Sequence, residues 1–364
     1  MTWKDISKGI LFGALLYLTS FFGSIVFLTP IIPIFIVWPC VGRHLSDIFL
    51  WLWYILAVAL FELLLGVKIV IHGNPAPPLG STLILCNHRT RLEWLFLMSY
   101  QLRCASLKDF RISLKAPLKK IPGPGWAMQT AGFLFLHRVW NQDKHRITQA
   151  MRYFARCYTR PQFLLFPEGI DFCARGLAKS KSFAEKNGFP MYEYVLHPRT
   201  TGFIHFVSEM RKNNILNFVV DVTVAYPKNI VHDEVDLVKG IAPEEVHIYV
   251  QHFPVSDIPV SEEKLEAWCQ DLWKQKENYL ARFYEHKTFS VISPKAAVSK
   301  SKEKEIYLLL WAVVVFWSMF LFGILYLLIM YSLFKWYCLL SIFTFVYFQA
   351  YYGGIDDFLY ASEI

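Results

Sequence analysis

The chain has 364 residues and a formal net charge of +8; 55% of its residues are hydrophobic and 17% are aromatic. This composition is too apolar for an ordinary soluble domain, so it predicts membrane segments. A basic surface suits an anionic partner such as a lipid headgroup or a polyphosphate. The sequence shows no zinc-finger, heptad or RNA-binding signature, and we therefore expect no nucleic-acid partner.

The N-terminal part of the chain contains two long apolar regions. Residues 9–38 carry no charge and are too long for the core of a cleaved signal peptide, so we expect an uncleaved anchor. Pro30 and Pro33 can divide this anchor into a span and a second, re-entrant or interfacial piece. Residues 48–70 also carry charged and aromatic side chains; they either span the membrane or lie flat or half-buried, and the composition favours the second arrangement.

A turn-rich linker at residues 72–80 precedes a different pattern, in which short apolar runs alternate with amphipathic ones. The expected strands are residues 82–86, 111–116, 133–136, 162–166, 218–225 and 245–253, and the expected helices between them are residues 92–102, 144–158 and 203–212. Such alternation predicts an α/β domain with a mixed, largely parallel sheet flanked by helices. Active residues in such sheets gather just past the carboxyl ends of the strands.

The remainder of the chain combines one soluble helix with a membrane hairpin. An apolar stripe at helical spacing predicts a helix at residues 261–286 that packs on the sheet, with Ser261 as its N-cap. Residues 306–330 and 333–351 are apolar runs of membrane length, which we interpret as a helical hairpin that turns near Lys335. The positive-inside rule places the lysine-rich linker before them, and with it the α/β domain, in the cytosol.

These features divide the chain into four parts. They are N-terminal membrane-anchoring helices (residues 1–72), a cytosolic α/β domain (73–290), a basic linker (291–305) and a C-terminal transmembrane hairpin with an acidic tail (306–364). The seven cysteines form no C-x-x-C pair, and no H-x-x-x-H spacing occurs. We therefore expect neither a disulfide framework nor a metal site, and a metal-dependent hydrolase is disfavoured.

His88 and Glu93 are the first candidates for chemistry, because they directly follow the expected strand at residues 82–86. A histidine at a strand end, with a carboxylate five positions later, is a candidate general base with its orienting partner. Residues five apart diverge by about 140° around a helix, so His88 must lie in the loop or at the helix start, with Glu93 in the first turns. The alternative is an ordinary loop histidine and an acid that interacts favourably with the helix dipole.

Three further segments can carry functional side chains. They are the basic and Gly/Pro-rich residues 115–126, the expected strand 132–138 that ends in Arg138, and the turn 166–169 with Glu168 at its tip. Each also has a structural explanation: solvated lysines, an arginine at a strand end, and an acid that accepts hydrogen bonds from turn N–H groups.

Together these motifs resemble the glycerolipid acyltransferases that use a histidine–acid motif, which transfer fatty acyl groups from acyl-CoA to glycerol phosphates and lysophospholipids. His88 and Glu93 match the family's H-x-x-x-x-D motif, residues 132–138 match G-x-x-F-[IL]-x-R, and residues 166–169 match F-P-E-G. The strings N-H-R-T-R-L-E-W and V-L-H-P-R-T-T-G-F resemble the lysocardiolipin acyltransferase branch, which also acylates lysophosphatidylinositol. Glu93 in place of aspartate, and Ile170 after the third motif, are departures from the family pattern.

The resemblance implies a role for each candidate residue. His88 and Glu93 would be catalytic. The residues implied to bind substrate are Arg138, Lys115, Lys119, Glu168 and Gly169, and those implied to contact the phosphates of CoA are Lys179, Lys181 and Arg199. The implied partners are a lysophospholipid, acyl-CoA as co-substrate and the bilayer, with no metal, no permanently bound cofactor and no protein partner. The implied location is the endoplasmic reticulum membrane, with several spans and the catalytic domain in the cytosol.

Two other functions remain open at this point. One is another acyltransferase: a lysophosphatidate or glycerol-phosphate enzyme, or a CoA-independent transacylase. The other is a catalytically inactive membrane protein that binds anionic lipid, for which the two departures from the family pattern, Glu93 and Ile170, are the sequence support.

Overall fold

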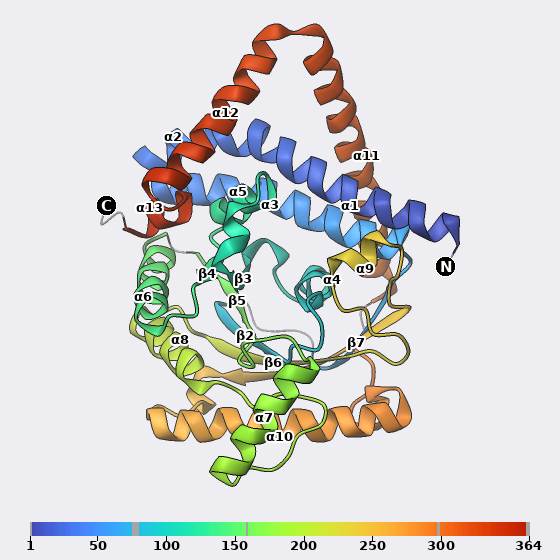
Figure 1. The fold of residues 1–364 in the computed structure, drawn as a ribbon, viewed down its shortest axis with the longest axis vertical. Helices are drawn as coiled ribbons and strands as arrows, with labels where there is room; N and C mark the ends of the chain where they lie inside the picture. Colours follow the sequence, from blue (N-terminus) through green and yellow to red (C-terminus); the bar gives the residue numbers. More distant parts are fainter. Residues whose placement is uncertain (1, 75–79, 158, 297–298, 362–364) are drawn as a thin grey trace.

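The computed structural model describes residues 2–74, 80–157, 159–296 and 299–361. An α/β body carries the N-terminal helices across one side, and a helical hairpin projects from that side (Figure 1). The expected linker at residues 72–80 falls largely on residues 75–79, which lie outside the described residues.

Within the described residues, seven strands form one sheet in the order β1-β7-β6-β2-β5-β3-β4. The strands are β1 (Lys68–Gly73), β2 (Thr82–Cys86), β3 (Phe110–Lys115), β4 (Leu134–Leu136), β5 (Gln162–Leu165), β6 (Phe218–Ala225) and β7 (Glu245–Pro254). All neighbouring pairs are parallel except β6 and β7. The predicted mixed, largely parallel sheet is therefore confirmed, and all six expected strands are present. β2 is buried along its whole length, as its unbroken apolar run predicts.

Strand β1 corrects the predicted boundary between the membrane region and the α/β domain. The preceding helical segment ends at residue 64, and Gly66 follows with a φ of 78°. The chain then enters the sheet at Lys68, where β1 pairs with β7. Because only Gly66 and Lys68 interrupt the apolar residues of the helix and β1, the sequence pattern merged the two, whereas the sheet already begins before the predicted boundary at residue 72.

Helices cover both faces of the sheet. The longer ones are α4 (Glu93–Cys104), α6 (Trp140–Arg156), α7 (Ala174–Asn187), α8 (Thr200–Lys212) and α10 (Glu262–His286), and the two shorter ones are α5 (Pro124–Thr130) and α9 (Glu234–Val238). Of these helices, α5, α7 and α9 were not predicted. α10 lies on the side of the sheet away from the hairpin, whereas α4 lies between the sheet and the N-terminal helices (Figure 1). Ser261 is the N-cap residue of α10, as predicted, and its side chain makes no capping hydrogen bond.

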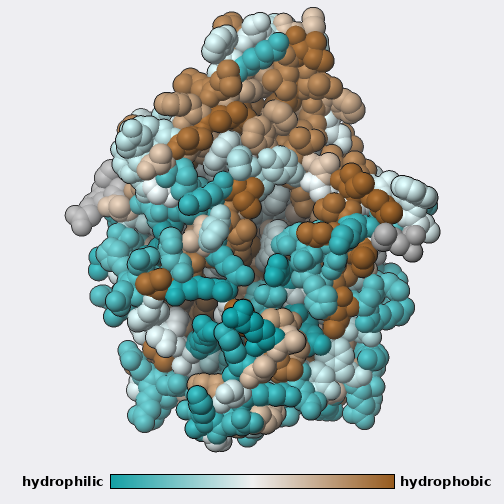
Figure 2. Space-filling view, viewed as in Figure 1, coloured by the Kyte–Doolittle hydropathy of each residue, from teal (hydrophilic) through white to brown (hydrophobic). Residues whose placement is uncertain are grey.

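Four helical segments among the described residues are long and apolar enough to cross a membrane, so the chain is a membrane protein. They are Trp3–Val37, which contains α1 (Trp3–Gly23) and α2 (Ile32–Val37); Pro39–Leu64, which contains α3 (Pro39–Ala59); and α11 (Lys300–Met330) and α12 (Ser332–Tyr351). In the most apolar stretch of the α3 segment 56% of residues are buried, against 17% in α11. The hairpin thus presents an apolar surface to its surroundings (Figure 2).

The C-terminal region departs from the prediction at both of its ends. The hairpin turns at Tyr331, and Lys335 lies inside α12. α11 already begins at Lys300, so the last part of the expected linker is helical. Residues 355–361, which include Asp356 and Asp357, are not a free tail, because they form α13 (Ile355–Ala361), which packs against α5 and α6.

Candidate active site

His88 and Glu93 lie beside each other where β2 ends and α4 begins. His88 Nδ1 is 3.1 Å from Glu93 Oε2. His88 lies in the loop, and Glu93 is the first residue of α4. The expected juxtaposition therefore exists, and it arises outside regular helix geometry, as the five-residue spacing requires.

The second oxygen of the Glu93 carboxylate is held by three donors. Glu93 Oε1 accepts hydrogen bonds from the N–H of Thr90 at 2.7 Å, from the hydroxyl of Thr90 at 2.8 Å and from the hydroxyl of Tyr226 at 2.9 Å. The side chain of Glu93 is fully buried. Oε2 is thereby left to face His88, and a rigid carboxylate in this position favours a proton on Nδ1.

The imidazole of His88 is positioned from its other face as well. It stacks on the ring of Phe166 with centroids 4.1 Å apart, and its side chain is 18% exposed. Asn87 fixes the loop to β6, because it exchanges two hydrogen bonds with the backbone of Val224 at 2.8 and 3.0 Å. With Nδ1 directed at Glu93, Nε2 is the ring nitrogen available to the adjacent pocket.

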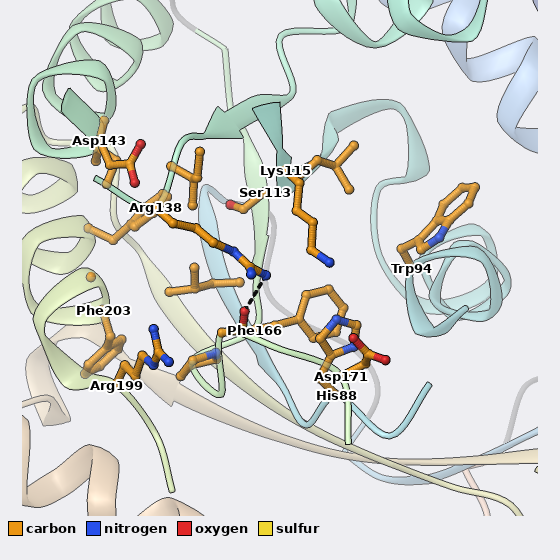
Figure 3. Close-up of a pocket in the computed structure, with 18 of the residues that line it drawn as sticks. His88, Trp94, Ser113, Lys115, Arg138, Asp143, Phe166, Asp171, Arg199 and Phe203 are labelled. Atoms are coloured by element: carbon orange, nitrogen blue, oxygen red, sulfur yellow. Dashed lines mark hydrogen bonds between the residues drawn. The ribbon is translucent and has the colours of Figure 1, made fainter. Parts of the chain in front are cut away.

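That pocket has a volume of about 660 Å³ and carries an excess of basic side chains. Its basic lining residues are His88, Arg91, Lys115, Arg138 and Arg199, and its acidic ones are Asp143, Asp171 and Glu234. Lys115 and Arg138 reach into the space above His88 and Phe166 (Figure 3). Leucine, isoleucine, phenylalanine and tryptophan side chains line the rest, so the pocket suits a ligand with both an anionic and an apolar part.

Arg138 adopts a backbone conformation that is unusual for a residue with a side chain. Its φ is 62°, in the left-handed region, which costs of order 1 kcal/mol. The N–H of the preceding His137 donates to Asp143 Oδ1 at 2.7 Å, and Arg138 Nη2 donates to the carbonyl of Gly169 at 2.8 Å. These contacts hold a strained backbone that directs the guanidinium into the pocket, a pattern typical of functional sites.

Gly169 and Arg199 complete this side of the pocket. Gly169 has a φ of 74°, and a Cβ there would lie 3.3 Å from Cδ of Arg199. The N–H of Arg199 donates to the carbonyl of Pro167 at 2.8 Å. The turn therefore places two arginine side chains beside Gly169. Arg138 donates to its carbonyl, and Arg199 lies against its Cα.

Four of the expected binding residues do not line the pocket. Lys119 is 4% exposed and pairs with Asp356 and Asp357, so in this structure it is turned away from the pocket. Lys179 and Lys181 lie on the exposed helix α7, away from the lining residues. The sequence gives no sign of either outcome, because a lysine in a basic run can be solvated, paired or bound to a ligand.

Glu168 is the fourth of these residues, and it lies behind the wall of the pocket. It is 3% exposed, and its Oε1 accepts hydrogen bonds from the N–H of His88 at 3.2 Å and from the indole N–H of Trp273 at 3.3 Å. Burial raises the pKa of Glu168 to about 7. Glu168 therefore holds the loop of His88 in place. This agrees with the structural explanation given above, that Glu168 accepts hydrogen bonds from backbone N–H groups, and the N–H of His88 is one of them.

Sequence reasoning missed Tyr226 and Trp273, which contact Glu93 and Glu168. Tyr226 directly follows the carboxyl end of β6, where the rule for parallel sheets places active residues, so that rule could have found it. Trp273 belongs to the apolar face of α10, and nothing in that face distinguishes it from a packing residue.

A buried imidazole–carboxylate pair that opens onto a basic and partly apolar pocket defines a site for acid–base chemistry on an amphipathic, anionic substrate. The sequence pattern of the family described as Acyltransferase matches residues 68–227, and that described as Acyltransferase C-terminus matches residues 236–319. The chain belongs to this family and is an acyltransferase.

The relatives identify its branch. Lysocardiolipin acyltransferase 1 of Gallus gallus is 41% identical over 350 residues, which cover 96% of this chain and 93% of that protein. Its counterpart from Danio rerio is 46% identical over 76% of this chain and 72% of that protein. Lysophosphatidylinositol acyltransferase 10 of Caenorhabditis elegans is 39% identical over 76% of this chain and 71% of that protein. The chain is a member of the glycerolipid acyltransferases in the branch that contains these proteins.

Proposed function

We propose that the protein transfers a fatty acyl group from acyl-CoA to a free glycerol hydroxyl of an anionic lysophospholipid, in phospholipid remodelling. Lysophosphatidylinositol, lysocardiolipin and lysophosphatidylglycerol are the acceptors we expect. The contact of His88 with Glu93 at the base of a basic pocket carries the proposal. The names of the relatives support the choice of acceptors. The intact contact also favours an active enzyme over an inactive lipid-binding protein.

The reaction follows from the orientation of His88. An alcohol is a weak nucleophile at neutral pH, so Nε2 takes the proton of the glycerol hydroxyl as its oxygen attacks the thioester carbonyl carbon. The tetrahedral intermediate collapses, the C–S bond breaks, and the imidazolium returns its proton to the departing CoA thiolate. Glu93 keeps the proton on Nδ1 and stabilises the imidazolium. This sequence needs no acyl-enzyme, and we expect direct transfer in a ternary complex.

The basic residues of the pocket suit the phosphate groups of the two substrates. Arg138 and Lys115 face the same space above His88 (Figure 3), so they can hold the lysolipid phosphate beside the base. Arg199 lines the same pocket, which supports a phosphate contact for it as well. We place the protein in the endoplasmic reticulum membrane with the α/β body in the cytosol, because three lysines near the start of α11 satisfy the positive-inside rule there.

A panel of acceptors tests the proposal. Purified protein in mixed micelles is given lysophosphatidylinositol, lysocardiolipin, lysophosphatidylglycerol or lysophosphatidate, each with and without oleoyl-CoA, and the release of CoA and the diacyl product are measured. We expect CoA-dependent product with the first three acceptors and none from the His88→Ala variant. A preference for lysophosphatidate would establish the alternative acyltransferase, and no CoA release with any acceptor would refute catalysis.

A further inference from the structure

Four charged side chains form a buried cluster behind the basic wall of the pocket, and we call this cluster the C-terminal clamp. Its carboxylates are Asp356 and Asp357 of α13, and its cations are Lys119 and Arg146. Lys119 Nζ lies 3.1 Å from Asp356 Oδ1 and 2.7 Å from Asp357 Oδ2. Arg146 contacts both carboxylates through its two terminal nitrogens. The clamp contains two positive and two negative groups, so its formal charges balance.

The burial of the clamp argues that it fixes position and does not merely add stability. The Asp356 side chain is fully buried, and those of Lys119 and Arg146 are 5% and 10% exposed. Removing such charges from water costs about as much as their attraction returns, so an apolar contact would anchor α13 at least as well. A charged network with several fixed partners instead defines one arrangement of the elements that it joins.

Lys119 connects the clamp to Lys115. Lys119 lies in the 3₁₀ turn Ala116–Lys120, which directly follows β3, and Lys115 is the last residue of that strand. Leu118 of the same turn lines the pocket. The carbonyl of Lys119 also accepts a hydrogen bond from Gln129 at 2.8 Å. The position of Lys119 therefore sets the position of the turn through which Lys115 enters the pocket.

Arg146 connects the clamp to Arg138 through α6. Arg146 lies one turn after Asp143 in α6, and Asp143 accepts the hydrogen bond from the N–H of His137. That bond holds the residue directly before the strained backbone of Arg138. Asp143 and Ile147, on either side of Arg146 in the sequence, both line the pocket.

We propose that α13 is a positioning element of the substrate site, which holds Lys115 and Arg138 at the separation needed to receive one lysolipid phosphate. This inference rests on the proposed function. Because α13 follows the hairpin, the membrane segment is coupled through the clamp to the phosphate-binding wall. Gln129 strengthens this coupling, since it donates to Gln349 of α12 at 2.9 Å and accepts from the N–H of Ile355 at 2.9 Å.

Substitution of Asp357 tests this role in the full-length enzyme. Its side chain is 29% exposed, so the amide of Asp357→Asn can reach solvent, while the clamp is left with one positive charge in excess. We expect the KM for lysophosphatidylinositol to rise about 5- to 10-fold, with kcat and the KM for oleoyl-CoA within about twofold of wild type. Asp357→Glu restores the charge and should recover most of the lysolipid affinity. Lys119→Met removes the opposite member of the pair and should raise the same KM.

Glu62→Gln is the matched control. Glu62 also joins a membrane segment to the body, through an ion pair with Arg103 at 2.8 Å, but it lies outside the pocket wall. It should lower the thermal midpoint without changing the lysolipid KM. An unchanged KM in folded Asp357→Asn protein overturns the inference, as does a loss of kcat that Glu62→Gln reproduces. A wild-type protein that acylates no lysolipid would instead refute the proposed function.

Discussion

Replacing Glu93 with glutamine should reverse the tautomer of His88. Three donors, two from Thr90 and one from Tyr226, converge on Glu93 Oε1. The glutamine oxygen must stay with these donors, because turning the amide would set its NH₂ group against them at a cost of about 1–3 kcal/mol for each unpaired group. The NH₂ group then faces His88 Nδ1 and donates to it. Nδ1 becomes an acceptor, Nε2 carries the proton, and the imidazole can no longer take a proton from the substrate.

The expected loss follows from that reversal. A wrong tautomer at a histidine–acid pair lowers kcat by on the order of 10⁴-fold, which corresponds to about 5.5 kcal/mol of activation free energy. Glu93→Asp keeps the charge and the tautomer, but its shorter side chain lengthens the contact with His88 by about one methylene. We therefore expect kcat to fall roughly 10-fold.

The assay measures thiol release from oleoyl-CoA at saturating lysophosphatidylinositol, with thermal unfolding as the control for folding. Tyr226→Phe gives an independent check, because it removes one of the three donors and leaves the carboxylate in place. We expect a smaller loss for it than for Glu93→Gln. Equal losses in the glutamine and aspartate variants, or a glutamine variant with a tenth of wild-type turnover, would refute this account of the pair.

Three further predictions concern the surroundings of the pair. Arg138→Ala should raise the lysolipid KM about tenfold with little change in kcat, and an unchanged KM would remove it from the phosphate site. Since burial raises the pKa of Glu168 from 4.5 to about 7, the folded state holds this proton more tightly, and the free energy of unfolding should fall by up to about 3 kcal/mol as the pH rises through that window. The thermal midpoint of Glu168→Gln should therefore rise relative to that of wild type as the pH is raised from 5 to 8. A difference in thermal midpoint that does not change with pH would contradict the raised pKa of Glu168. Gly9→Val should lower activity and the thermal midpoint, because a Cβ there would lie 2.4–2.5 Å from the backbone at and near α9; Gly323→Val, where a Cβ meets nothing within 4 Å, is its control.

The site could be predicted where function and local geometry depend on the same short segment. His88 and Glu93 lie in one loop and the first helical turn after it, so their spacing already limited how they could meet. Gly169 and Arg138 likewise end neighbouring motifs, and their hydrogen bond follows from parallel strands that end at one edge.

The sequence could not show the position of a side chain that depends on a distant partner. Lys119 reads as part of a basic run, yet its partner Asp357 lies 238 positions later, after the membrane hairpin. Strand β1 was missed for another reason: an apolar run interrupted only by Gly66 and Lys68 is compatible with both a helix end and a strand, and only its pairing with β7 decides between them.

The loop that carries His88 is held between elements that lie outside the His88–Glu93 pair. On one side, Arg91 of the loop donates its N–H to the carbonyl of His232 at 2.9 Å, just before α9, and α9 packs on α1 through the close approach of Gly9 to Gly240. On the opposite side, the C-terminal clamp holds the wall that carries the basic residues. The first support contacts the N-terminal membrane helix α1, and the second includes α13, which follows the hairpin. We infer that the hairpin and the N-terminal helices, through these two contacts, contribute to the geometry of the pocket in addition to anchoring the chain.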